Sequence, residues 1–171
     1  MIKRVAPGAW PPPMAQSRRL AHRDLINSVR GLDPNTDPGI TEAISKYLVV
    51  RSAGYVEATR DSVAEEYVRT VSHVRVMRRV KSSLWRGVGV SPAQLEEFID
   101  SFDQDWKLEF SEFLVKDDEA RGDSLRALVD ARKQIAHGGS TGVRRDTALK
   151  WADVSMDVGD WLIKRFNPTA R

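Results

Sequence analysis

The sequence predicts an all-α protein built as an antiparallel bundle of about four to six helices. Apolar residues recur every three or four positions along most of the chain, which is the spacing of one helix face. No stretch alternates between apolar and polar residues over a useful length, as a half-buried strand would. Short segments rich in glycine and proline separate the helical patterns and favour antiparallel neighbours. With 171 residues, the chain is long enough for one domain with a hydrophobic core.

Residues 1–13 are rich in proline and are expected to form an irregular arm, followed by a single helical domain over residues 14–171. Trp10 is expected to anchor this arm on the body of the protein or on a neighbouring chain. The opening residues contain no long apolar run, and no segment approaches the ~20 apolar residues of a membrane span. We therefore expect a cytoplasmic protein with no membrane partner. The sequence contains no cysteine, which excludes disulfides and thiolate metal sites.

The first helix is expected over residues 14–30, and a proline-containing loop follows over residues 31–39. A long helix then runs from about Thr41, its expected N-cap, into the low seventies. This helix is apolar on two sides, which is typical of the central element of a fold. Unbroken it would reach ~45 Å, and a bend near residues 60–61 is an alternative.

The charges are segregated along the chain, although the net charge is only +3. Residues 67–95 contain no carboxylate, and a helical pattern from Val74 to Leu84 carries a basic stripe that includes Arg75 and Arg79. Arginine pairs with phosphate in a bidentate fork, so these two arginines are candidate RNA contacts. A charged face that meets only solvent is the alternative.

A further helix is expected to start at Ser91, because Pro92 occupies its first turn and Gln94 completes a capping-box pattern. The segment after it is acidic, and its apolar side chains have the spacing of a core stripe: Leu95, Phe98, Ile99, Phe102, Trp106, Phe110 and Phe113. Its paired carboxylates have no histidine nearby, which favours a solvated face over a metal site. We expect neither a metal nor another cofactor.

The next helix ends in the most distinctive segment of the chain, residues 131–139. Gly138 and Gly139 are the expected stop, because glycine adopts the left-handed conformation that closes a helix without steric cost. Arg132 precedes His137 by five positions, which places the two side chains about 140° apart on a regular helix. They can meet at one site only if the last turn is distorted or if a second copy supplies a partner.

The last helix is expected over residues 146–166, with Pro168 beyond its end. The turn before it, residues 138–143, lacks the lysine and serine that end a phosphate-binding P-loop. Arg144 follows this turn closely and is expected to face the same pocket as the motif helix and to contact RNA.

The segment Arg132-Lys133-Gln134-Ile135-Ala136-His137-Gly138 resembles the Arg-x4-His signature of HEPN-domain proteins, in particular the RiboL-PSP-HEPN or MAE-like branch. HEPN domains are small all-helical modules, and many are metal-independent ribonucleases of toxin–antitoxin and antiviral systems. The resemblance implies catalytic roles for Arg132 and His137. Lys133 stands where this branch usually has asparagine, and it is a candidate RNA contact.

The resemblance also implies a third catalytic residue, Glu57. HEPN families often place a glutamate or a similar polar group on the early long helix, where it faces the arginine and the histidine. The alternative is a surface salt bridge from Glu57 to Arg60 or to charges beside Asp61. Exposed pairs of this kind are common and contribute little to stability.

Cleavage of RNA without a metal needs a base for the 2′-hydroxyl, an acid for the leaving oxygen and a cation for the charge on the phosphoryl group. Imidazole titrates near neutral pH, which suits His137 to the proton transfers, and a guanidinium such as that of Arg132 suits the phosphate. One histidine offers one proton-transfer group, whereas two are useful. A homodimer that places two motif helices side by side would supply both, and related families often assemble in this way.

Two functions from different classes follow. The first is a metal-independent endoribonuclease, a toxin or antiviral-defence effector with its active site at a dimer interface, held in check by an antitoxin or partner protein. The second is a catalytically silent HEPN-like module that binds RNA, nucleotide or a partner protein. Arg132 and His137 favour the enzyme, whereas Lys133 in the usual place of asparagine favours the silent module.

Overall fold

The computed structural model describes residues 9–72, 89–116, 120–139 and 142–169. Every regular element within these ranges is a helix, which confirms the expected all-α bundle. The helices are α1 (Pro13–Arg30), α2 (Pro38–Val71), α4 (Pro92–Asp100), α5 (Gln104–Val115), α6 (Arg121–Ala136) and α7 (Arg145–Arg165). None of these described helices is long and apolar enough to cross a membrane. The helical pattern expected from Val74 to Leu84, with Arg75 and Arg79, lies outside the described residues.

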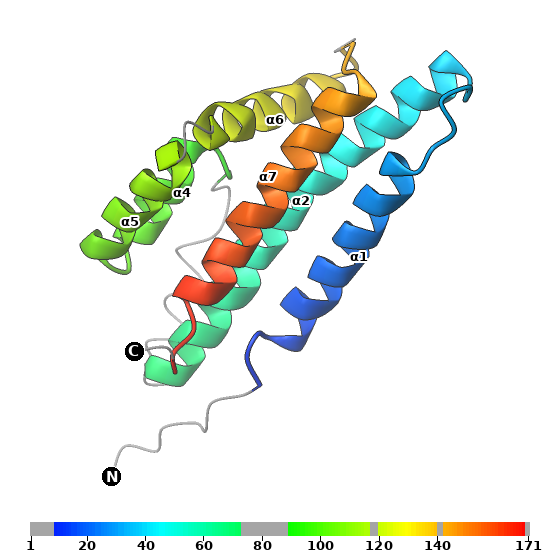
Figure 1. The fold of residues 1–171 in the computed structure, drawn as a ribbon. Helices are drawn as coiled ribbons and strands as arrows, with labels where there is room; N and C mark the ends of the chain where they lie inside the picture. Colours follow the sequence, from blue (N-terminus) through cyan, green and yellow to red (C-terminus); the bar gives the residue numbers. More distant parts are fainter. Residues whose placement is uncertain (1–8, 73–88, 117–119, 140–141, 170–171) are drawn as a thin grey trace.

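The long helix α2 is the centre of the bundle, as its two apolar faces predict. Figure 1 shows α1 and α7 running alongside α2, while α6 packs against both α2 and α7. The short helices α4 and α5 pair with each other and contact α6. Because α2 packs against α1, α6 and α7, it buries side chains on several faces, and Leu48, Val49 and Val63 are fully buried.

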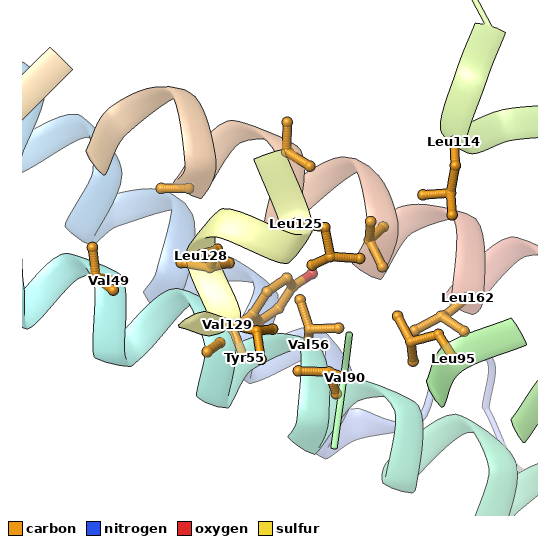
Figure 2. Close-up of a cluster of buried hydrophobic side chains, with 14 of the residues drawn as sticks. Val49, Tyr55, Val56, Val90, Leu95, Leu114, Leu125, Leu128, Val129 and Leu162 are labelled. Carbon is orange, nitrogen blue, oxygen red and sulfur yellow. The ribbon is translucent and has the colours of Figure 1, made fainter. Parts of the chain in front are cut away.

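The hydrophobic core lies where α2, α6 and α7 meet. Figure 2 shows Val56 of α2, Leu125 and Leu128 of α6 and Leu162 of α7 within one cluster of buried side chains. All four side chains are fully buried. Burying a side chain of this size stabilises a fold by about 1.5–3 kcal/mol.

Helix α2 begins at Pro38, so the expected N-cap at Thr41 is wrong. Asp37 is the cap, and its Oδ1 accepts hydrogen bonds from the backbone N–H groups of Gly39 and Ile40 at 2.8 and 3.1 Å. Proline fits the first helical position because its missing N–H is not needed there. The 34-residue helix then continues through residues 60–61 without a break.

The acidic segment forms two helices rather than one continuous stretch. The expected start at Ser91 is confirmed, where the hydroxyl donates to Gln94 Oε1 at 2.8 Å. Helix α4 ends at Asp100, and α5 begins with Asp103 as N-cap, whose Oδ1 accepts from the backbone N–H of Asp105 at 2.8 Å. The apolar stripe runs across this break because both helices cover the same core. The seven stripe residues are buried or packed against the core, as expected.

The buried guanidinium of Arg60 fastens α2 to the segment that leads into α4. Its side chain is fully buried, and Nη1 donates to the carbonyl oxygen of Gly89 at 2.8 Å. Nε and Nη2 donate to Asp61 Oδ1 at 2.9 and 2.7 Å, and the guanidinium lies 5.3 Å from the centre of the Phe98 ring. A buried charge is costly unless it is paired and hydrogen-bonded, and these contacts satisfy the buried guanidinium.

Polar contacts hold α1 and the N-terminal arm against α7. Arg19 forms a two-pronged ion pair with Asp160 through Nε and Nη2, and Nη2 of Arg30 donates to both carboxylate oxygens of Asp153. The indole N–H of Trp10 donates to the carbonyl oxygen of Ile163 at 2.8 Å. Of the two anchors expected for Trp10, the body of the same chain is therefore the one observed.

Two glycines in the middle of helices have opposite surroundings. A Cβ added to Gly159 of α7 would lie only 2.6–2.7 Å from carbons of the buried Tyr55 ring, so this glycine lets α7 approach α2. A Cβ added to Gly54 of α2 would meet nothing within 4 Å. Packing therefore requires glycine at position 159 and does not require it at position 54.

We expect alanine at these two positions to change stability in opposite directions. Gly54→Ala should raise the free energy of unfolding by about 0.5–1 kcal/mol, because glycine is a poor helix former. Gly159→Ala should lower it by about 1–3 kcal/mol through overpacking against Tyr55. Thermal and urea unfolding of the two variants would measure both effects, and equal changes in the same direction would contradict this account.

Candidate functional site

The distinctive segment closes helix α6 in the way that its glycines predict. Gly138 has a φ of 74°, in the left-handed region. Its N–H donates to the carbonyl oxygen of Ile135 at 3.1 Å, and the N–H of Gly139 donates to that of Gln134 at 2.9 Å. These two bonds are the Schellman pattern of helix ends. The turn places His137 at the C-cap position, with its side chain in solvent.

Arg132 is exposed, lies four residues before the last residue of α6, Ala136, and lines two cavities. One cavity of about 320 Å³ also contains Glu57 and Lys133, with Gly89 and Gln94 among its walls. The second cavity, of about 370 Å³, opens between α1 and α2. Arg132 makes no hydrogen bond or ion pair within the described part of the chain. Its guanidinium is therefore available to a ligand from either cavity.

Glu57 shares the smaller cavity with Arg132, and the salt bridge considered as its alternative role is not present. Arg60 turns instead to Asp61 and to the backbone of Gly89. Within the ranges that the structure describes, Glu57 makes no ion pair of its own. Its role in catalysis stays a prediction: Glu57 lines a cavity with Arg132, and His137 is not among the residues of that cavity.

Two of the remaining predicted RNA contacts, Lys133 and Arg144, lie within the described residues and line different cavities. Lys133 Nζ lies 3.8 Å from Asp130 Oδ1, and both side chains are 60% exposed, so this pair holds the lysine only weakly. Arg144 is exposed at the start of α7, in a cavity lined by Gly142 and Pro38 that does not include Arg132. The structure therefore places Arg144 apart from the cavities of the motif arginine.

Within one chain, neither cavity lined by Arg132 includes His137. This separation agrees with the 140° offset expected from their spacing, because α6 stays regular up to its capped end. Both side chains are exposed, so a second copy of the chain can reach either of them.

A buried histidine near this site, His22, was not singled out in the sequence. Its Nε2 lies 2.9 Å from Ser155 Oγ, and Ser155 donates to the carbonyl oxygen of Ala152, so the imidazole Nε2–H is the donor to Ser155. The ring stacks on Tyr55 with 4.6 Å between centroids. Burial, with a smaller contribution from the charge of Arg51, lowers the pKa of His22 to about 4. In the sequence, burial of His22 is indicated by its spacing of four and seven residues from the buried Ile26 and Val29 of α1.

The carboxylate pairs of the acidic segment contact cations and hydroxyls of the protein. Lys107 pairs with Asp100, Arg165 pairs with Glu109, and the hydroxyl of Ser111 donates to Glu96. Among the described residues, no group of three or more histidines and carboxylates could hold a metal ion.

The six described helices form an all-helical module with an exposed arginine and an exposed histidine near the end of α6. The family model described as RiboL-PSP-HEPN matches residues 18–165, and the chain belongs to this family. The match spans all six described helices, from within α1 to the end of α7. Comparison with curated proteins and with solved structures gave no match.

The low pKa of His22 predicts that stability falls in mildly acidic solution. The unfolded imidazole binds a proton as the pH drops below about 6.5, whereas the folded one stays neutral until about pH 4. The free energy of unfolding should therefore fall by up to about 1.4 kcal/mol per pH unit in this window. Urea unfolding of wild type and His22→Gln at pH 7, 6 and 5 would check this. Parallel losses in the two proteins would show that His22 is not the cause.

Proposed function

We propose that this protein is a metal-independent endoribonuclease of the HEPN type, with Arg132, His137 and Glu57 as its catalytic residues. The observation that supports this most is the position of Arg132. Its guanidinium is exposed beside Glu57, makes no contact with a carboxylate of the described residues, and lies on the same helix as the exposed His137. An exposed guanidinium without a carboxylate partner can form paired hydrogen bonds with a phosphate group.

In the proposed reaction the 2′-oxygen of a ribose attacks the adjacent phosphorus, and the 5′-oxygen of the next nucleotide leaves. A base takes the proton of the 2′-hydroxyl, and an acid returns a proton to the leaving oxygen. The products are a 2′,3′-cyclic phosphate and a 5′-hydroxyl. Arg132 stabilises the negative charge of the phosphoryl oxygens, and His137 carries out a proton transfer. Glu57 lines the same cavity as Arg132 and is the third catalytic residue of this proposal.

We propose that the second proton-transfer group comes from another copy of the chain. An apolar stripe along the first half of α2 supports this arrangement: Ile40, Tyr47 and Val50 are 55%, 54% and 37% exposed. Their spacing of seven and three residues puts them on one helix face. Val50 also lines the larger cavity with Arg132, so a copy that covers the stripe would lie beside the motif helix.

The HEPN assignment also supports a biological setting for this activity. We propose that the protein is a toxin or antiviral-defence effector that acts on RNA in the cytoplasm and is restrained by an antitoxin or another partner protein. Lys133, Arg144, Arg75 and Arg79 remain candidate contacts to that RNA.

One observation favours a different function, a catalytically silent module that binds RNA, nucleotide or a partner protein. Arg132 and His137 do not line a common cavity in a single chain. If no second copy completes the site, the exposed arginine can still bind phosphate, but cleavage has only one histidine to serve it.

We expect the purified protein to cut single-stranded RNA in the presence of EDTA and to leave 2′,3′-cyclic phosphate ends. His137→Ala and Arg132→Gln should each lower the rate by at least about 100-fold. Arg126→Gln is the matched control, because it removes an exposed arginine of the same helix that pairs with Asp123. Binding of RNA without cleavage, or equal rates in wild type and His137→Ala, would instead favour the silent module.

The dimer makes a separate prediction. Tyr47→Glu places a charge on the apolar stripe of α2 and should convert a dimer into a monomer with at least about tenfold lower activity. Leu108→Glu is the control, because Leu108 of α5 is equally exposed, at 55%, but lies on another helix. Light scattering and the cleavage assay would measure both effects.

A heterodimer of one Arg132→Gln chain and one His137→Ala chain tests whether the two copies share a site. Such a heterodimer, purified with two different tags, should be clearly more active than either parent homodimer, because one intact arginine and one intact histidine come from opposite chains. A wild-type monomer with full activity would contradict the shared site.

A further inference from the structure

The larger cavity lined by Arg132 is a cleft between three helices. α1 contributes one face, α2 contributes the facing residues, and α6 contributes only the arginine. The lining residues are Ser17, Arg18, Ala21, His22, Val50, Arg51, Gly54, Tyr55, Ala58 and Arg132. Serine, alanine and glycine at the points of closest approach leave a volume of about 370 Å³.

Three arginines line this cleft, and none of its lining residues is a carboxylate. Nη1 of Arg18 donates to the carbonyl oxygen of Ala58 and to Ser62 Oγ, which holds the side chain in place without neutralising its charge. Arg51, like Arg132, has no hydrogen-bond or ion-pair partner in the described ranges. By contrast, Arg19, beside Arg18 on α1, is neutralised by Asp160. The positive charge is therefore concentrated in the cleft.

Gly54 leaves open space on the α2 side of this cleft. Glycine in the middle of a helix costs about 0.5–1 kcal/mol relative to alanine. Packing does not require it here, because a Cβ at this position would meet nothing within 4 Å. The bare backbone instead widens the cleft between Arg51 and Tyr55.

The floor of the cleft is formed by the stacked rings of His22 and Tyr55. Burial keeps both rings uncharged at neutral pH, because it lowers the pKa of His22 to about 4 and raises that of Tyr55 to about 12. The charge available to a ligand therefore comes from the arginines on the walls. Guanidinium groups bind phosphate oxygens with paired hydrogen bonds.

We propose that this cleft binds consecutive phosphates of the RNA strand whose cleaved phosphate contacts Arg132. The strand runs across α1 and α2, with Arg18 and Arg51 on the phosphates that neighbour the cleavage point. This inference rests on the proposed ribonuclease function, for which it supplies a substrate track. A mononucleotide carries the same phosphate chemistry, so the test includes one.

The test measures binding of a fluorescent single-stranded 2′-O-methyl RNA, which lacks the 2′-hydroxyl nucleophile and cannot be cut. Arg51→Gln should weaken binding roughly tenfold at low salt. It should also lower the slope of log affinity against log salt by about 0.7, the loss of one phosphate contact to a single strand. Arg126→Gln, which removes the same charge from α6 outside the cleft, should change affinity less than about twofold.

Gly54→Leu tests the space itself, because its side chain would occupy the cleft while every arginine of the cleft is kept. We expect weaker RNA binding with an unchanged or higher thermal unfolding midpoint, since leucine is the better helix former. If Gly54→Leu fails to fold, the RNA affinities of Arg51→Gln and Arg126→Gln still test whether the cleft binds RNA. Equal affinities in those two variants would overturn the proposal.

Two further outcomes separate this proposal from the proposed function. If RNA binding depends on Arg51 but unmodified RNA is not cleaved, the result supports RNA binding by the cleft and contradicts the proposed ribonuclease activity. If cleavage depends on His137 but the substitutions at Arg51 and Gly54 do not change RNA binding, the result contradicts RNA binding by the cleft and supports the ribonuclease activity. Displacement of the RNA by ADP at micromolar concentration, with no tighter binding of longer strands, would overturn the RNA track in favour of a mononucleotide site.

Discussion

The buried ring of Tyr55 is the contact on which the arrangement of the three long helices depends. It belongs to α2, α7 reaches it through Gly159, and α1 stacks His22 on its face. A larger residue at position 159 would push α7 away from α2. The same ring forms the floor of the cleft that leads to Arg132. The packing of the bundle and the shape of the candidate binding surface are therefore set by one aromatic side chain.

The arginines of this chain differ in function according to what surrounds them. Arg60 is fully buried and satisfied by Asp61 and the backbone of Gly89, so it ties helices together. Arg19 is neutralised by Asp160 and holds α1 against α7. Arg51 and Arg132 are exposed and have no such partner in the described residues, which leaves their charge to a ligand. The modest net charge of +3 hides this distribution.

The end of α6 explains why a composite site is the natural hypothesis for this family member. The Schellman turn keeps the helix regular through Ala136, so Arg132 and His137 stay on different faces. A distorted last turn would have allowed them to meet within one chain, and that alternative is not observed. A second copy is then the simplest source of the missing partner, and the exposed stripe around Tyr47 offers it a surface.

The sequence by itself determined the all-helical class, the central position of α2 and the glycine stop after His137, because each depends on local periodicity or on backbone geometry. It placed the cap of α2 four residues late, at Thr41 instead of Asp37, and missed the break at Asp103, because helix caps compete locally and apolar spacing continued across both points. The motif identified Arg132 and suggested Glu57. Only the tertiary structure decided that Glu57 shares a cavity with Arg132, and that Arg18, Arg51 and His22 surround a second one. These residues are far apart in the chain, and no local pattern records which faces of three helices come together.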